Sequence, residues 1–178
     1  DWVLEGAKSV VLHGDCADKL VVSARTSGDR SDANGVTLFL VDAGQEGVAR
    51  RGYRLHDSTH AAEISLSSVR VPGAAVLGEV GNGLKLVERV YQAGIAAVAA
   101  EAVGAMETLH TMTVEYLKTR VQFGQPIGAN QVLQHRMVDL LIEIEQVRSC
   151  VMLAASTLEA DRLTRERHLS AAKHLVGR

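Results

Sequence analysis

The stretch YLKTRVQFGQPIGANQVLQ, from Tyr116 to Gln134, decides the fold because one long helical pattern ends in it and a second begins. Gly124 and Pro126 predict the end of the first helix, since glycine accepts the left-handed cap conformation and proline cannot continue a helix. Asn130 is predicted to cap the second helix with its side chain. The sequence therefore predicts a helical hairpin or corner.

Apolar residues on both sides of this corner recur at helical spacing. Side chains three or four positions apart lie on one face of a helix. A first helix is predicted over residues 82–119, a second from the corner to about residue 160, and a third from near Thr164. The apolar positions are Leu84, Val87, Tyr91, Ile95, Val98, Ala102, Ala105, Leu109, Met112 and Tyr116 in the first helix, and Leu133, Met137, Leu140, Ile144, Val147, Val151 and Leu158 in the second.

The first part of the chain instead shows short apolar runs and period-two alternation, which predict β-strands. The polar stretch 27–35 is predicted to be a hairpin loop, because its residues do not follow the ligand order of a calcium loop. We expect a β domain over residues 1–78 and a helical domain over residues 79–178. The predicted strands are Val10–Leu12, Leu20–Ala24, Val36–Val41 and Ala61–Val71.

Composition excludes several classes of protein. The net charge of -2 argues against a nucleic-acid binder, which would carry a basic stripe. No apolar run reaches the roughly 18 to 20 residues of a membrane span. The two cysteines, Cys16 and Cys150, lie far apart without a metal or disulfide pattern, so we expect a reducing, cytoplasmic location and no metal site.

The two ends of the chain suggest a fragment. The chain starts at Asp1 and Trp2 inside a strand-like pattern, and it ends at Arg178 inside a helical one. Natural domains rarely begin and end in this way. We therefore expect a longer parent protein.

The corner carries side chains suited to a ligand. The guanidinium of Arg120 is a planar fork that suits phosphate, Phe123 offers a flat apolar surface, and amides come from Gln122, Asn130 and Gln131. The start of a helix also points unpaired backbone N–H groups outward, which favours an anion. The pattern fits a phosphorylated, flat ligand, but the residue types alone favour a simpler interpretation, in which the arginine caps a helix and the phenylalanine makes a turn contact.

The run RVQFGQPI followed by Gln131 resembles the signature R-x-Q-F-G-x-x-I-x-x-x-Q of the acyl-CoA dehydrogenase family. The resemblance covers essentially the whole chain, and the sequence motifs are most similar to those of the small subunits of pimeloyl-CoA-type dehydrogenases. It implies an α+β fold, with an antiparallel β-barrel or sandwich middle domain followed by an up-and-down helical bundle, both truncated. Further motifs agree in order: LEGAK at 4–8, HGDCADKLVVSART at 13–26, GVTLFLV at 35–41 and VRVPGAAVLG at 69–78.

The resemblance also implies an activity and a set of site residues. In this family a glutamate removes an α-proton from an acyl-CoA while a hydride passes to the flavin of FAD, with electron transfer flavoprotein as the expected acceptor. The enzymes are oligomers, so we expect a homo- or hetero-oligomer, either a dimer or a tetramer. The residues implied to contact the adenine-diphosphate part of FAD, generally that of a neighbouring subunit, are Arg120, Gln122, Phe123, Ile127, Asn130 and Gln131; those implied to line the acyl chain are Tyr91, Gly94, Ile95 and Val98.

The chain departs from the family pattern at the catalytic positions. Most members carry their glutamate beyond the point that Arg178 reaches; a minority carry it on the long helix, one position before an arginine, and these two positions are Gly94 and Ile95 here. Many also place tryptophan and threonine against the flavin, at the positions of Val10 and Leu12. We therefore expect no catalytic residue in this chain and no activity when it is alone.

Three alternatives remain open. Glu101 interrupts the apolar helix, and a buried carboxylate there would have a raised pKa and act as a base, unless it faces a polar seam or pairs with an arginine. The parent is either an enzyme or a non-catalytic scaffold subunit that lends Arg120 and Gln131 to the FAD of another chain. A flavin-independent helical interaction module would need only the heptad-like second helix.

Overall fold

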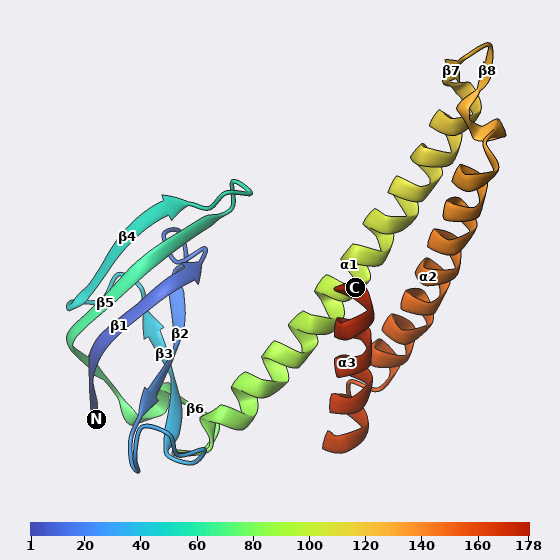
Figure 1. Cartoon of the computed structure of the whole chain (residues 1–178). Helices are drawn as coiled ribbons and strands as arrows, with labels where there is room; N and C mark the ends of the chain where they lie inside the picture. Colours follow the sequence, from blue (N-terminus) through green and yellow to red (C-terminus); the bar gives the residue numbers. More distant parts are fainter. The chain divides into compact units, whose positions relative to one another are not determined.

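The computed structural model describes all 178 residues, which divide into two compact units, Asp1–Val87 and Glu88–Arg178 (Figure 1). The predicted domain limits, 1–78 and 79–178, stay a prediction. The elements are β1 (Trp2–Leu12), β2 (Lys19–Arg25), β3 (Val36–Asp42), β4 (Val48–Arg54), β5 (His60–Val71), η1 (Gly73–Ala75), β6 (Val76–Leu77), α1 (Gly83–Thr119), β7 (Val121–Gln122), β8 (Gln125–Pro126), η2 (Ile127–Ala129), α2 (Gln131–Ser156) and α3 (Arg162–Val176).

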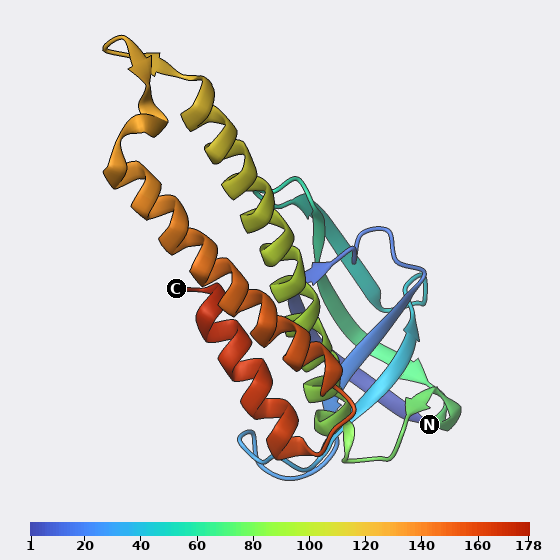
Figure 2. The ribbon, with the colours of Figure 1, turned by 90° about the vertical axis from the view of Figure 1, so that its right-hand side faces the viewer.

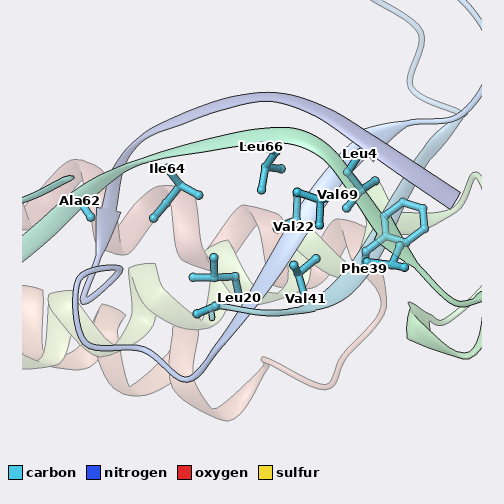
Figure 3. Packing of buried hydrophobic residues seen from close by; sticks show 11 residues of the cluster. Leu4, Leu20, Val22, Phe39, Val41, Ala62, Ile64, Leu66 and Val69 are labelled. Carbon is cyan, nitrogen blue, oxygen red and sulfur yellow. The ribbon is translucent and has the colours of Figure 1, made fainter. Parts of the chain in front are cut away.

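The first unit is built from two antiparallel three-stranded sheets, ordered β1-β5-β4 and β2-β3-β6. Side chains from both sheets meet in one core, as Figure 3 shows for Leu20 and Val41 on one side and Ile64 and Leu66 on the other. This arrangement is a sandwich, and it confirms the predicted α+β class with antiparallel sheets. The buried core residues are Leu4, Leu20, Val22, Phe39, Val41, Ala43, Ala62, Ile64, Leu66, Val69 and Val71.

All four predicted strand regions are confirmed as strands, but the early start of β1, the strand β4 and the two-residue strands β6, β7 and β8 were not predicted. β1 begins at Trp2, eight residues before the predicted start at Val10. β4 was missed because its sequence, VARRGYR, has three arginines and no apolar alternation. β4 lies at the edge of its sheet, where charged side chains reach water and oppose edge-to-edge association.

The second unit packs three helices side by side (Figure 2). α1 contributes small residues, Ala96, Ala99 and Val103, and α2 contributes Val147 and Val151. Small side chains allow the helix axes to approach closely. Leu169 and Ala172 of α3 complete this core.

The predicted apolar face of the first helix is not the face that the chain buries. Tyr91 and Val98 are 64% and 65% exposed, and Leu109, Met112 and Tyr116 are similarly exposed. The buried face is offset along the sequence and centres on the small residues of the core. The sequence pattern identified the helix correctly but not its buried face, because α1 is apolar on more than one side and its small residues give a weaker signal than the large ones.

The helix limits differ slightly from the predicted ones. α2 ends at Ser156, earlier than the predicted end near residue 160, and α3 begins at Arg162, two residues before Thr164. The side chain of Asp161 caps α3 by accepting a hydrogen bond from the Thr164 amide at 3.1 Å. None of the helices combines the length and the apolar character that crossing a membrane requires.

Candidate functional site

The corner between α1 and α2 contains a small β-hairpin at its tip, formed by β7 and β8 (Figure 1). Phe123 and Gly124 form the two-residue turn, with φ values of +52° and +82°. Positive φ at both central positions is typical of the type I′ turn, which matches the twist of the flanking strands. The prediction that Gly124 caps the first helix was therefore wrong. The helix ends at Thr119, and the amide of Arg120 closes its last turn on the Tyr116 carbonyl at 2.8 Å.

Phe123 is presented to solvent in a strained conformation. Its side chain is completely exposed, at 101% of the reference area. A bulky residue with positive φ is an outlier, and such strain persists only where the surrounding structure imposes it. The hairpin therefore holds a flat apolar ring out in water, where it contributes nothing to the core of this chain.

Arg120 has an uncommitted guanidinium. Its side chain is exposed and makes no hydrogen bond or ion pair within the chain, whereas the neighbouring Lys118 pairs with Glu115 at 2.7 Å. The backbone of Arg120 is fixed, because its carbonyl accepts a hydrogen bond from the Ile127 amide at 2.9 Å. Five N–H donors thus remain available to an anion at a defined place.

The start of α2 lies next in the chain. Asn130 accepts a hydrogen bond from the Val132 amide with its Oδ1 atom at 3.1 Å, which confirms the predicted N-cap. Gln131 is the first residue of the helix and is exposed. The Gln122 amide donates to the neighbouring Val121 carbonyl at 2.9 Å. The structure thus brings all six predicted cofactor residues into one short exposed segment.

This segment fits the diphosphate part of a flavin dinucleotide. It contains no acidic residue between Tyr116 and Gln134, so nothing in it opposes a negative charge. The free guanidinium of Arg120 and the N–H groups at the start of α2 favour phosphate, and the exposed ring of Phe123 offers a surface for a flat ring system.

The four predicted acyl-chain residues line one cavity of about 480 Å³ between α1 and α3. The walls are mainly apolar, and Lys173 of α3 is the charged residue among them. A side chain at Gly94 would meet no atom within 4 Å, so this wall has room. The α1 residues are Tyr91, Gly94, Ile95, Val98 and Ala99; Lys173 and Val176 lie in α3, and Gly177 is its C-cap.

The candidate base and the flavin-facing strand residues lie elsewhere. Glu101 is exposed on α1 and has no ion pair, so it is not the buried carboxylate that a base at this position would require. Val10 and Leu12 lie at the end of β1 in the first unit, where 54% and 63% of their surfaces are exposed. These side chains offer no hydrogen-bonding group.

A second cluster of polar residues was not predicted. It surrounds the connection between α2 and α3, where Arg165 is buried and its Nε donates to Oε1 of Gln92 at 2.5 Å. Its Nη1 also donates to the Ala160 carbonyl at 2.7 Å, and Arg89 donates to the Leu158 carbonyl at 2.9 Å. One signal for this cluster was present in the sequence. Gln92 is a polar residue next to the alanine-rich part of the first helix, where a buried polar side chain needs a partner.

Comparisons with known proteins agree on one family. The family described as "Acyl-CoA dehydrogenase, C-terminal domain" matches residues 81–178. The short-chain specific acyl-CoA dehydrogenase of Megasphaera elsdenii is 34% identical over 158 residues, which cover 86% of this chain and 41% of that protein. The chain thus spans about two fifths of the length of this curated relative.

Solved structures show the same similarity. Butyryl-CoA dehydrogenase from Megasphaera elsdenii superposes with a TM-score of 0.86 at 29% identity, over 98% of this chain and 46% of that chain. PigA with FAD and proline superposes with a TM-score of 0.89 at 26% identity, again over 98% of this chain and 46% of that chain.

Proposed function

Since this chain belongs to the acyl-CoA dehydrogenase family, we propose that it forms part of a FAD-dependent enzyme that introduces an α,β double bond into an acyl-CoA thioester. The observation that carries the proposal is the corner at Arg120–Gln131, where uncommitted donors, a helix start and an exposed aromatic ring meet. These features are of no use to the chain's own core, and they suit a flavin dinucleotide.

Within this proposal the corner binds the diphosphate. Arg120 contributes a charge-assisted fork, and the first amides of α2 with Gln131 supply further donors. Phe123 and Ile127 contribute the apolar contacts of the hairpin. Because the ring of Phe123 points away from its own chain, we propose that it contacts the FAD of a neighbouring subunit in an oligomer. When bound, FAD accepts the hydride that leaves the β-carbon of the substrate.

The acyl chain is proposed to lie along Tyr91, Gly94, Ile95 and Val98. Their shared cavity supports this, because an apolar wall of this size suits a hydrocarbon chain. No side chain at positions 94 and 95 removes a proton, and Glu101 is exposed. We therefore propose that the α-proton is taken by a residue outside this chain, and that the chain alone is inactive.

Activity on an acyl-CoA thioester tests the last statement directly. The purified chain, supplied with FAD and an artificial electron acceptor, is expected to reduce the acceptor no faster than a control without protein. Turnover above that background would contradict the proposed inactivity of the isolated chain and would make Glu101 the candidate base.

A second candidate function is supported by four residues. Val10, Leu12, Gly94 and Ile95 stand where an active member would carry functional side chains, which favours a non-catalytic scaffold subunit that completes the FAD site of a partner. Adding a catalytic subunit of the family distinguishes the two functions. A scaffold raises the turnover of the partner without adding a flavin of its own, whereas an enzyme fragment leaves the partner unchanged.

The remaining parts of the proposal follow from the family. We propose electron transfer flavoprotein as the electron acceptor, and a cytoplasmic location in keeping with two free cysteines, Cys16 and Cys150. A visible absorption spectrum of the purified chain with added FAD, recorded with its mass by light scattering, tests the cofactor and the oligomer together. A flavin band that co-elutes with an oligomer supports the proposal, and a colourless chain at every FAD concentration contradicts it.

A further inference from the structure

The end of β1 carries a bulge in its pairing with β5. Lys8 pairs with Ile64 and Val11 pairs with Ala62, so β1 has one residue more than β5 between these two pairs. At the bulge, Val10 has a φ of +53°. Bulges redirect side chains and are frequent beside active sites.

The backbone of Val10 is strained. A β-branched residue with positive φ is an outlier, because its side chain crowds the backbone in the left-handed region. His13, three residues later, has a φ of +55°. Strained residues cluster at ligand sites and persist only where neighbouring groups impose the conformation. A specific constraint on this bulge is therefore expected.

Glu63 of β5 supplies the constraint. Its Oε1 atom accepts hydrogen bonds from the Val10 amide at 3.3 Å and from the Tyr53 hydroxyl at 2.7 Å. The Ser9 hydroxyl, then the Tyr53 hydroxyl and the Val10 amide, hold the pKa of Glu63 below its usual range. Arg51, the cross-strand neighbour on β4, is the charged side chain that also favours the ionised form. The carboxylate is thus a fixed, charged acceptor for the bulge.

We propose that Glu63 is a positioning residue that holds the Ser9–Val10 bulge so that Val10 and Leu12 are presented to a bound flavin. The inference rests on the proposed function, because the family pattern puts the flavin-facing residues at these two positions. β1 is an edge strand, so the backbone groups on its outer edge have no strand partner. With apolar side chains at both positions, the placement of this backbone decides which hydrogen bonds the flavin receives.

Three variants of the full chain test the proposal. Glu63→Ala removes the acceptor, so the bulge is expected to relax and the pairing of Leu12 with Ala61 to be lost. Glu63→Ala with Val10→Gly is expected to keep the pairing, because glycine adopts positive φ without strain. Glu63→Gln keeps a neutral acceptor and is expected to resemble the wild type at neutral pH.

Two measurements are made on each variant. Nuclear Overhauser contacts between Leu12 and Ala61 report the strand register without any flavin. Titration with FAD, followed by quenching of flavin fluorescence, reports affinity. We expect Glu63→Ala to weaken FAD binding at least about tenfold and the double variant to recover it. A tenfold change is a typical effect of a lost positioning contact of about 1.4 kcal/mol.

The outcomes separate this inference from the proposed function. A wild-type chain that binds no FAD contradicts the proposed function, and with it the flavin part of the inference. A Glu63→Ala chain that keeps the Leu12–Ala61 contact overturns the positioning role, whatever its FAD affinity. A lost contact with unchanged FAD affinity overturns the link to the flavin and leaves Glu63 a structural residue.

Acid tests whether the negative charge of Glu63 holds the bulge. The pKa of Glu63 is lower in the folded chain than in the unfolded one, so its contribution is present above the unfolded pKa and is lost as the pH falls through the folded pKa. The Leu12–Ala61 contact of the wild type is therefore expected to weaken in acid, and that of Glu63→Gln is expected to be less dependent on pH. Equal pH profiles would contradict the role of the charge.

Discussion

The helical unit contains two connections between helices, and their polar groups are used in opposite ways. In the connection between α2 and α3, the guanidinium groups of Arg89 and Arg165 donate to backbone carbonyls and to other side chains. In the connection between α1 and α2, the guanidinium of Arg120 has no partner in the chain. Arginine therefore stabilises the α2–α3 connection through hydrogen bonds within the chain, whereas at the α1–α2 connection its donors are free to bind a ligand.

Burial and hydrogen-bond partners distinguish structural arginines from ligand-binding arginines in this unit. A buried guanidinium with satisfied donors stabilises the fold, and its removal leaves buried acceptors unpaired. An exposed guanidinium with a fixed backbone and no partner does not contribute to the stability of the fold, and its N–H donors are available to bind an anion. Substitutions at the α2–α3 connection should therefore change stability, and those at the α1–α2 corner should change binding.

Arg165→Ala is expected to produce the largest loss of stability. The change leaves Oε1 of the buried Gln92 and the partly buried carbonyl of Ala160 without their donor, which costs about 2–4 kcal/mol in the free energy of unfolding. Urea titration followed by circular dichroism measures the loss. The control is Arg162→Ala, whose exposed pair with Glu166 is expected to leave stability essentially unchanged.

Equal losses in the free energy of unfolding for Arg165→Ala and Arg162→Ala would contradict this distinction, because burial would then not separate the arginines of this unit. A large effect of Arg165→Ala that becomes smaller when Gln92→Leu is added would support the contact between the two side chains. The second change removes the unpaired acceptor and so tests the contact between the two side chains.

Phe123→Asn is expected to have a smaller effect of opposite sign. Asparagine tolerates the left-handed conformation at this turn position better than phenylalanine, and the exposed ring makes no contact to lose. The free energy of unfolding should rise by about 0.5–1 kcal/mol, while FAD binding weakens. Phe123→Ala keeps the strain and should not stabilise. A destabilised Phe123→Asn chain would show that the ring has a structural role.

The smallest effect concerns the caps of the two helices. Asp161 caps α3, and its hydrogen bonds from the hydroxyl and the amide of Thr164 hold its pKa below its usual range. This contribution is present above the unfolded pKa and is lost as the pH falls through the folded one. Asn130, the cap of α2, does not titrate. Acid should therefore loosen the start of α3 before that of α2, as hydrogen exchange at the two helix starts would show.

Exchanging the two caps provides the control. Asp161→Asn should remove the acid sensitivity of α3, and Asn130→Asp should transfer it to α2. Identical acid profiles in the wild type and the exchanged chain would contradict the assignment of the cap as the titrating group.

Much of this architecture could be predicted from the sequence because it depends on local signals. The three helices, the cap at Asn130 and the strands with period-two alternation follow from spacing and turn chemistry. β4 could not be predicted, because Arg50 and Arg51 interrupt any apolar alternation and the strand exists through its pairing with β5. Tertiary pairing, and not local propensity, decides such an edge strand.

The membership of the candidate site stays a prediction, and its geometry was not predicted. Five corner residues were selected from their side-chain types and Ile127 from the family resemblance, but the hairpin of β7 and β8 was not predicted. The signal was present, since Phe123 and Gly124 form an X-Gly pair between two short extended segments, but the proline after them favoured a simple helix end. The buried pair of Gln92 and Arg165 joins residues that are 73 positions apart, and no local pattern connects them.

The affinity of the chain for FAD with Arg120→Ala, measured beside Arg167→Ala, tests the central claim most directly. Both arginines are exposed and make no bond within the chain, so neither substitution should change stability. Loss of a charge-assisted contact to the diphosphate should weaken binding by about 10- to 100-fold in Arg120→Ala alone. Equal affinities for FAD in the two variants would contradict the assignment of the corner as the cofactor site.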